Sequence, residues 1–367
     1  MSDLKEKCLL EFLSKDPYSR MRKVAKYSIF DMLRALNWAA SGKLMDAFYE
    51  LGLDKTLARP RSPTEIAHEH YIVDVRLLWE FLDTLVHMGI LDEAAGRYKL
   101  RFFKKKIKKP SVVDEFMRTP LKAVFEVVDM MGENVVDVLM TGERELDWVK
   151  DAAIAFEPLE FSPQMVMMRL NACEIIHNYL KDVLWVEGDR GMRILIMGLA
   201  SGYGVINVAQ YFREIGSTII ALDFSEREIN LARGLLEDFN LEVWVDKYDI
   251  FKDLLRAKVV RDVLDGRKFS ACIAFERWRF FDKIQRSQLV TNIAYSLEIY
   301  GCLGEFSIVK EEARAFNTVL YTIRGWSGYM DVNEKRGSLC IAFQRLKERM
   351  KKMIVRADLP LVRGVWL

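Results

Sequence analysis

Three glycines crowd the stretch RILIMGLASGYG, which covers Arg193 to Gly204. Gly198, Gly202 and Gly204 follow a run of apolar residues and precede an amphipathic segment. Glycines between a strand and a helix let the backbone turn sharply and bring the free N–H groups of the helix close to a ligand. The same spacing also occurs in turns that only pack a helix on a strand, so the loop is a candidate nucleotide site that needs further support.

Two aspartates further along the chain supply that support. Asp223 ends the next apolar segment, about twenty residues after the loop, where doubly wound folds place an acid for ribose hydroxyls. Asp249, followed by Ile250, ends the segment after that and can accept a hydrogen bond from an adenine amino group. A strand-end aspartate also caps turns, but its combination with the glycine loop favours a cofactor site over a structural turn.

The elements that must position these residues follow a regular alternation. From Arg193 onward, short apolar segments alternate with amphipathic ones, which is typical of a parallel α/β sheet. We expect strands at Arg193–Met197, Thr218–Leu222, Glu242–Val245, Ala271–Phe275 and Glu305–Val309, helices at Tyr203–Ile215, Glu226–Asp238 and Phe281–Leu297, and an edge strand within GSLCIAFQRL. Ser225 and Glu228 form the S-x-x-E pattern of a capping box at the second helix.

The N-terminal part of the chain is mostly helical. A helical pattern covers Lys43–Ala58, Ser62 and Pro63 mark a helix start, and DVRLLWEFLDTLVHMGIL carries one broad apolar face before a hairpin pattern around Gly96. Helix, short helix, long helix and hairpin is the order of a winged helix. A further helix is expected over Ser162–Leu184.

Composition excludes several classes of protein. The 55 basic and 53 acidic residues are nearly balanced, so net charge offers no argument for a nucleic-acid partner. The five cysteines are scattered, which argues against a disulfide framework and a zinc site and favours a reducing cytoplasm. The longest uncharged run contains three glycines, so we expect a buried strand, loop and helix and no membrane span. Scarce His and Gln with abundant Lys, Arg and Glu are consistent with a thermophilic source.

The glycine loop, Asp223 and Asp249 on three successive strands resemble the class I S-adenosylmethionine-dependent methyltransferases. The chain is most similar to the small-molecule O-methyltransferase family with an N-terminal winged-helix dimerisation domain, because MDAFYELGLDKTL, SPTEIA, LLWEFLDTLVHMGILDE and RYKL follow the order of that family's N-terminal half. The resemblance runs from about Tyr27 to Leu346. It implies an α/β, Rossmann-like doubly wound methyltransferase domain preceded by an all-helical, winged-helix domain.

The resemblance also implies a division of the chain and a set of partners. Residues 1–115 would form the helical winged-helix dimerisation domain, residues 116–186 the connecting helices that line the substrate pocket, and residues 187–367 the Rossmann-like S-adenosylmethionine-binding domain. We expect S-adenosylmethionine as the cofactor, a small-molecule substrate with an O, N or S nucleophile, a homodimer formed through the N-terminal domain, and no metal.

Site residues follow from the family's motifs. The resemblance places the cofactor against Gly198, Ala200, Ser201, Gly202, Gly204, Asp223, Phe224, Asp249, Ile250 and Phe275. It places the substrate near Met165, Met168, His177 and Trp278, and the ionisable residues closest to the family's catalytic position are Glu276 and Arg277.

The sequence departs from the family at three positions. Ala200 replaces a glycine, which is a small steric change, and Ile196 replaces the acid that contacts the methionine part of the cofactor. The histidine that acts as general base in many members is missing from CIAFERWRFFDKIQ. Transfer from a sulfonium depends mainly on alignment, so an acidic or strongly nucleophilic acceptor needs little help from a base.

Two alternatives remain open. The missing histidine and acid favour a non-catalytic winged-helix regulator or scaffold with a degenerate cofactor domain. The basic run RFFKKKIKK lies where a winged helix would meet DNA, although a solvated charge run is its commoner meaning. Methylation of RNA or protein would keep the cofactor site and change only the acceptor.

Overall fold

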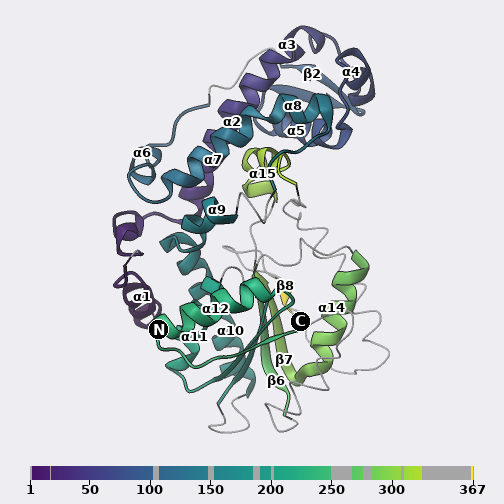
Figure 1. The fold of residues 1–367 in the computed structure, drawn as a ribbon. Coiled ribbons are helices and arrows are strands. Elements are labelled where there is room, and N and C mark those ends of the chain that lie inside the picture. Colours follow the sequence, from purple (N-terminus) through teal and green to yellow (C-terminus); the bar gives the residue numbers. More distant parts are fainter. Residues whose placement is uncertain are drawn as a thin grey trace. The chain divides into compact units, whose positions relative to one another are not determined.

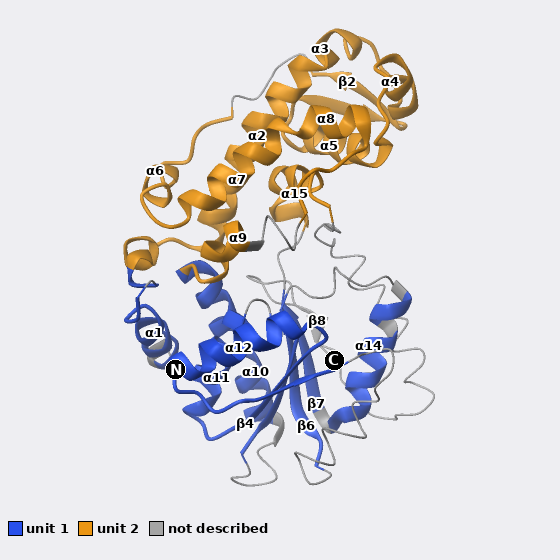
Figure 2. Cartoon of the chain, viewed as in Figure 1, with its two compact units in different colours: residues 1–19, 163–309, 330–367 blue, residues 20–162, 310–329 orange. Residues whose placement is uncertain are grey.

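The structure is a computed structural model whose described residues, 2–16, 18–101, 107–147, 153–184, 191–199, 202–248, 267–275, 283–306, 310–324 and 365–366, fall into two compact units (Figure 2). Unit 1 comprises residues 1–19, 163–309 and 330–367, and unit 2 comprises residues 20–162 and 310–329. These boundaries differ from the predicted 1–115, 116–186 and 187–367. The first residues pack on helices of unit 1, and a helix after residue 310 packs inside unit 2.

In the described part of unit 1, six strands form a sheet of order β5-β4-β3-β6-β7-β8, and of these only β8 is antiparallel to its neighbour (Figure 1). Every residue of β3 and β6 is buried, as expected for the central strands of a parallel sheet covered on both faces. The strands are β3 (Arg193–Met197), β4 (Thr218–Asp223), β5 (Trp244–Lys247), β6 (Phe269–Phe275), β7 (Leu297–Phe306) and β8 (Val365–Trp366).

The helices of unit 1 connect and cover these strands. α10 packs on α11 and on β7, α11 and α12 pack on β4, and α14 contacts β7. Their bounds are α1 (Ser2–Phe12), α10 (Pro163–Leu184), α11 (Tyr203–Arg213), α12 (Glu226–Asp238) and α14 (Lys283–Ser296). The doubly wound α/β prediction is therefore confirmed for the described part of unit 1.

Most predicted elements are found, but the last described parallel strand differs. β3 and α12 have the predicted bounds, whereas β7 begins at Leu297, well before the predicted Glu305, and follows α14 directly. Gly301 and Gly304 interrupt the apolar pattern of β7, so the sequence does not show the full length of the strand. Both positions need glycine because neighbouring atoms lie too close for a Cβ. A Cβ on Gly304 would lie 2.9 Å from Ile176 Cδ1 of α10. The strand predicted within GSLCIAFQRL lies outside the described residues.

Unit 2 contains the predicted series of helices followed by a hairpin. Ser62 and Glu65 form the capping box of α4, with Pro63 in its first turn. The hairpin turns at Ala95 and Gly96, both with positive φ, as a two-residue hairpin turn requires. The elements are α2 (Ile29–Glu50), α3 (Leu53–Thr56), α4 (Pro63–Glu69), α5 (Val75–His87), β1 (Leu91–Ala94), β2 (Arg97–Leu100), α6 (Val113–Phe116), α7 (Lys122–Glu133), α8 (Val135–Thr141) and α9 (Ala153–Glu160); a 3-10 helix, η1 (Tyr18–Val24), spans the boundary with unit 1.

A late segment of the chain completes the core of unit 2. The 3-10 helix η5 (Lys310–Glu312) leads into α15 (Arg314–Leu320), which packs against α2, α5 and α7. Asn37 of α2 accepts a hydrogen bond from the Phe316 backbone N–H and donates one to the Glu312 carbonyl, at 3.1 and 2.7 Å. Thr84 and Thr318 share a buried hydrogen bond of 2.7 Å. These contacts make α15 part of the unit 2 core.

Candidate functional site

The candidate site lies where the order of the sheet reverses. From β3 the chain moves outward through β4 and β5 and then returns to β6 on the other side of β3. Ligands of open α/β sheets bind outside the carboxyl ends of the strands at such a point. The glycine loop follows β3 there, and Asp223 ends the neighbouring strand β4.

The backbone of the glycine loop requires glycine at two described positions. Gly198 and Gly202 have φ values of +84° and +83°, a region that residues with a Cβ rarely adopt. A Cβ on Gly202 would also lie 2.8 Å from Leu235 Cδ1 and 3.0 Å from Ala232 Cα, both on α12. Gly202 therefore serves close packing of the loop on α12 and forms the N-cap of α11. Gly204 lies in the first turn of α11 and is buried.

Asp223 joins this loop to the next strand end. Its side chain is only 3% exposed, and its two carboxylate oxygens accept from two different turns. Oδ2 accepts from the Leu199 N–H and Oδ1 from the Ser225 N–H, each at 2.8 Å. Ser225 caps α12 by accepting from the Glu228 N–H, but its own N–H goes to Asp223 and not to Glu228 as a full capping box would have it. Asp223 therefore ties the turn after β3 to the turn after β4.

An N-terminal arm, residues 2–16 with 18 and 19, holds the start of α11 from outside the sheet. Phe12 stacks on Tyr18 and on Phe239, with ring centroids 4.5 and 5.4 Å apart. Tyr203, the residue after Gly202, meets the Tyr18 ring edge-on at 5.8 Å. Lys15 places its ammonium 4.4 Å from the centre of the Phe239 ring. The arm thus packs between Tyr203, the first residue of α11, and Phe239 at the end of α12. The sequence patterns did not indicate this packing.

Arg169 on α10 is a site candidate that the sequence analysis missed. Its side chain is 1% exposed, and Nη1 donates to Asn207 Oδ1 of α11 at 3.4 Å. Asn207 is fully buried, and its Nδ2 has no hydrogen-bond partner among the described residues. Asn207 lies five residues after Gly202, about 7 Å along the helix axis. An arginine inside an apolar stretch is the only sequence signal for this pair of donors.

His177 lies at the other end of the α10–α11 contact. Its Nδ1 lies 3.2 Å from the hydroxyl of Tyr211, eight residues after the start of α11. Burial and the charge of Lys181 lower the pKa of His177 below its usual 6.5. The structure therefore places His177 away from the strand ends, next to a structural partner. Met165 and Met168, by contrast, are buried near the N-terminal end of α10.

The remaining predicted residues are only partly described. Phe275 is buried at the end of β6, 5.9 Å from the Phe306 ring, and Phe224 is 52% exposed beside Asp223. Ala200, Ser201, Asp249, Ile250, Glu276, Arg277 and Trp278 lie outside the described residues. Ile196 is fully buried within β3 between Ala221 and Ile273 of the flanking strands, so an apolar side chain suits this position.

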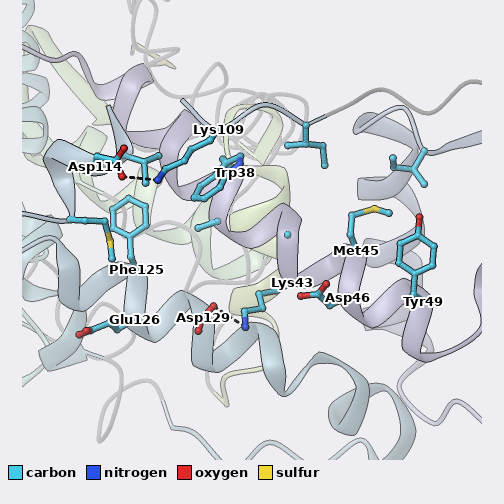
Figure 3. Close-up of a pocket in the computed structure, with 16 residues that line it drawn as sticks. Trp38, Lys43, Met45, Asp46, Tyr49, Lys109, Asp114, Phe125, Glu126 and Asp129 are labelled. Atoms are coloured by element: carbon cyan, nitrogen blue, oxygen red, sulfur yellow. Dashed lines mark hydrogen bonds and ion pairs between the residues drawn. The ribbon is translucent and has the colours of Figure 1, made fainter. Parts of the chain in front are cut away.

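Unit 2 carries a concave region, which we call the α2 groove. It has a volume of about 890 Å³ and runs along one face of α2, with α7 and the segment around α6 as its other walls (Figure 3). Its aromatic lining residues are Trp38, Tyr49 and Phe125, and its ionisable ones are Lys43, Asp46, Lys109, Asp114, Glu126 and Asp129. The α2 groove contains none of the site residues predicted from the sequence.

Among the described residues, no group of three or more His, Cys, Asp or Glu side chains is arranged to hold a metal ion. No helix in this part of the chain is long and apolar enough to cross a membrane.

Comparisons with known proteins support the fold. No family model matches the sequence, and no curated protein matches it either. Among solved structures, the carbon methyltransferase of CurJ aligns over 99% of this chain and 97% of its own, with a TM-score of 0.58 and 13% identity. The CMeT domain of the citrinin polyketide synthase aligns over 99% and 94%, with a TM-score of 0.60 and 13% identity.

An O-methyltransferase family 2 protein from Planctomyces limnophilus, crystallised with apigenin, is also similar. It aligns over 93% of this chain and 95% of its own, with a TM-score of 0.54 and 16% identity. The chain therefore has the fold of these carbon and oxygen methyltransferases, and the predicted resemblance is confirmed at the level of the fold.

Proposed function

We propose that the protein transfers a methyl group from S-adenosylmethionine to a small molecule. The observation that carries the proposal is the pair of hydrogen bonds accepted by the Asp223 carboxylate. They connect the glycine loop to the end of β4 at the switch point of the sheet. Such a connection fixes the two strand ends that a nucleoside would bridge. The similarity to carbon and oxygen methyltransferases supports the reaction class.

The described residues fit the proposed cofactor at two places. Asp223 offers acceptors to the ribose hydroxyls, as an acid at this strand end does in doubly wound folds. Arg169 donates to Asn207, whose Nδ2 has no hydrogen-bond partner among the described residues, and this pair lies one and a half turns behind the loop. We propose that they hold the methionine carboxylate, since a carboxylate accepts strongly from a guanidinium. This contact would offset the loss of the acid at Ile196.

The protein side chains serve to align the acceptor atom with the methyl group of the cofactor more than to donate or remove protons. When bound, the cofactor supplies an electrophilic methyl group on a sulfonium, which an acceptor attacks in line. Three of the four histidines lie in unit 2, and the fourth, His177, is hydrogen-bonded to the Tyr211 hydroxyl. We therefore propose an acceptor that reacts without a histidine base, at oxygen, nitrogen or sulfur, or at an activated carbon as in the similar carbon methyltransferases.

Calorimetric titration with S-adenosylhomocysteine tests the proposal. We expect saturable binding to the wild-type protein and at least about tenfold weaker binding to Arg169→Gln, because the amide cannot supply the charge-assisted bonds. Arg34→Gln, an exposed arginine of α2 in unit 2, is the matched control and should bind as the wild type does. No detectable binding to the wild type at about 1 mM ligand would refute the proposed function.

Finer assignments for unit 2 are also proposals. We propose that α4, α5 and the β1–β2 hairpin form a winged helix, which the bridge between Arg61 and Tyr98 at the edge of the hairpin supports. We further propose a homodimer formed through this unit, which sedimentation velocity would test. Cys8, Cys173, Cys272 and Cys302 are free and buried, which is consistent with the proposed cytoplasmic location.

A further inference from the structure

The α2 groove has buried apolar walls and a charged edge. Nine of its 16 lining residues are apolar or glycine. Phe125, Ile90 and Val113 are at most 6% exposed, whereas the side chains of Asp129 and Asp114 are 62% and 66% exposed. A concave surface of this size with apolar walls and a few polar groups has the properties of a small-molecule site.

Gly42 opens the groove in the middle of α2. A Cβ at this position would meet nothing within 4 Å among the described residues. Trp38 and Met45, one turn before and one turn after it, line the same groove (Figure 3). Gly132 of α7 differs, because a Cβ there would overlap the side chain of Lys43. Glycine inside a helix lowers its stability, and packing against the described residues explains that cost at Gly132 but not at Gly42.

The charges around the groove disfavour an anionic ligand. Four of the lining residues are acids and two are lysines, so their formal charges sum to −2. Lys43 Nζ lies 2.8 Å from Asp129. Lys109 Nζ lies 2.6 Å from Asp114 and 5.6 Å from the centre of the Trp38 ring (Figure 3). Both ammonium groups are therefore already paired with carboxylates, and an anion would meet an excess of negative charge.

The charged edge also argues against another protein as the occupant. Glu126, Asp129 and Asp114 are exposed around the groove. A protein that covered the groove would take these carboxylates out of water, which is costly, and the centres of protein interfaces are depleted of charged residues. A small molecule that lies on the apolar walls leaves the charged edge in water.

We propose that the α2 groove binds an uncharged aromatic small molecule, whose rings lie over Gly42 between Trp38 and Met45. Phe125 of α7 would contact the same rings from the opposite wall, so that ring and apolar contacts supply the affinity. This site is separate from the proposed methyl-transfer site and does not depend on it, because all its lining residues belong to unit 2.

Fluorescence titration of the full-length protein with N-phenyl-1-naphthylamine tests the proposal. This uncharged dye becomes bright in apolar surroundings. We expect saturable binding with a Kd of about 10 μM or tighter. The anion 8-anilino-1-naphthalenesulfonate has the same rings and should bind the groove at least about tenfold more weakly, because its sulfonate meets the negative lining.

Gly42→Leu should fill the groove without disturbing the fold. The new side chain meets no described neighbour, and leucine favours a helix more than glycine does. The midpoint of chemical denaturation should therefore not fall, while binding of the dye in the groove is lost. Trp38→Leu should weaken this binding about fivefold. Gly234→Leu is the matched control, because Gly234 lies inside α12 of unit 1 and a Cβ there also meets nothing within 4 Å among the described residues; it should keep full dye binding.

Three results would overturn the proposal. One is equal dye binding by Gly42→Leu and the wild type, or no saturable binding by the wild type. Another is equal affinity of the groove for the dye and its sulfonate analogue. The third is a sedimentation result in which Gly42→Leu converts a dimer to a monomer, because the groove would then be a contact between copies. Titration of the same variants with S-adenosylhomocysteine is a separate measurement that tests only the proposed methyl-transfer site.

Discussion

The glycine loop of unit 1 and the α2 groove of unit 2 are both candidate binding sites, but backbone forms the first and side chains form the second. The loop is made of backbone in glycine-only conformations, fixed by one buried carboxylate. The groove is made of side chains on a helix surface, held by ion pairs of 2.6 to 2.9 Å. Gly202 of the loop has no room for a Cβ, whereas surface ion pairs contribute at most about 1 kcal/mol each and can be lost singly.

Gly202→Val should separate the two regions most clearly. The new side chain would meet Leu235 and Ala232 and would have to adopt a φ of +83°. We expect no measurable binding of S-adenosylhomocysteine at about 1 mM and a stability loss of about 2 kcal/mol or more, while the ion pairs of the α2 groove in unit 2 should not be disturbed. The control is Gly216→Ala, whose φ is +68° but whose Cβ would meet nothing within 4 Å.

The two measurements for these variants are calorimetric titration and chemical denaturation. Gly216→Ala should lose about 1 kcal/mol of stability and keep full affinity, since it adds strain without a clash. If Gly202→Val binds the ligand normally, the packing of the loop on α12 does not shape the site.

Asp223→Asn should have the next largest effect. The amide keeps the shape of the carboxylate but offers one acceptor where the Leu199 and Ser225 N–H groups need two. We expect a 10- to 100-fold loss of affinity for S-adenosylhomocysteine, because one buried N–H is left without its acceptor. Asp238→Asn, at the exposed end of α12, should behave like the wild type in the same titration.

Phe12→Ala tests whether the N-terminal arm supports the loop at a distance. Removing the ring leaves a cavity among Tyr18, Tyr203 and Phe239, so we expect about 3 kcal/mol lower stability in denaturant. The first residue of α11 would also lose its support, so affinity for S-adenosylhomocysteine should fall about threefold to tenfold. Leu10→Ala, at a 57% exposed position of the same helix, is the control. Unchanged affinity in Phe12→Ala would limit the arm to a role in stability.

His177→Gln should leave binding unchanged and alter only the pH dependence of stability. The folded protein lowers the pKa of His177, so the neutral ring stabilises the fold above the unfolded value of 6.5 and this contribution is lost as pH falls. The wild type should therefore lose more stability than His177→Gln between about pH 7.5 and pH 5.5. His68→Gln, an exposed histidine in unit 2, should follow the wild type. A changed ligand affinity in His177→Gln would return His177 to the site.

Elements that produce a local pattern of apolar, capping or glycine residues could be predicted from the sequence. β3 and α12 were predicted with their bounds because an apolar run and a capped amphipathic helix are local signals. Asp223 was predicted as a ligand residue, but its hydrogen bonds to Leu199 and Ser225 depend on how two turns meet in space. Glycines inside β7 hid that strand, because the reason for glycine at these positions is close contact in three dimensions: Gly304 meets Phe306 and Ile176 of α10, and Gly301 meets Leu297 and Ser270.

Contacts between distant segments could not be predicted in the same way. Nothing in the local pattern around Phe12 indicates that its ring packs beside Phe239, and an amphipathic α1 alone does not choose between the two units. The pairing of Arg169 with Asn207 likewise depends on how α10 lies on α11. The α2 groove escaped prediction because its acids and aromatic residues come from three separate segments.

The route of the chain through the two units has a consequence during synthesis. The aromatic residues of the N-terminal arm are made before their partner Phe239, which follows 227 residues after Phe12 in the sequence. At ordinary rates of translation this leaves the arm without its docking surface for about 10–45 s. Unit 2 has the same problem, because α15 of its core is made only after strands β3 to β7 of unit 1. Neither unit can mature in N-to-C order, so we expect the nascent chain to depend on chaperones more than its size suggests.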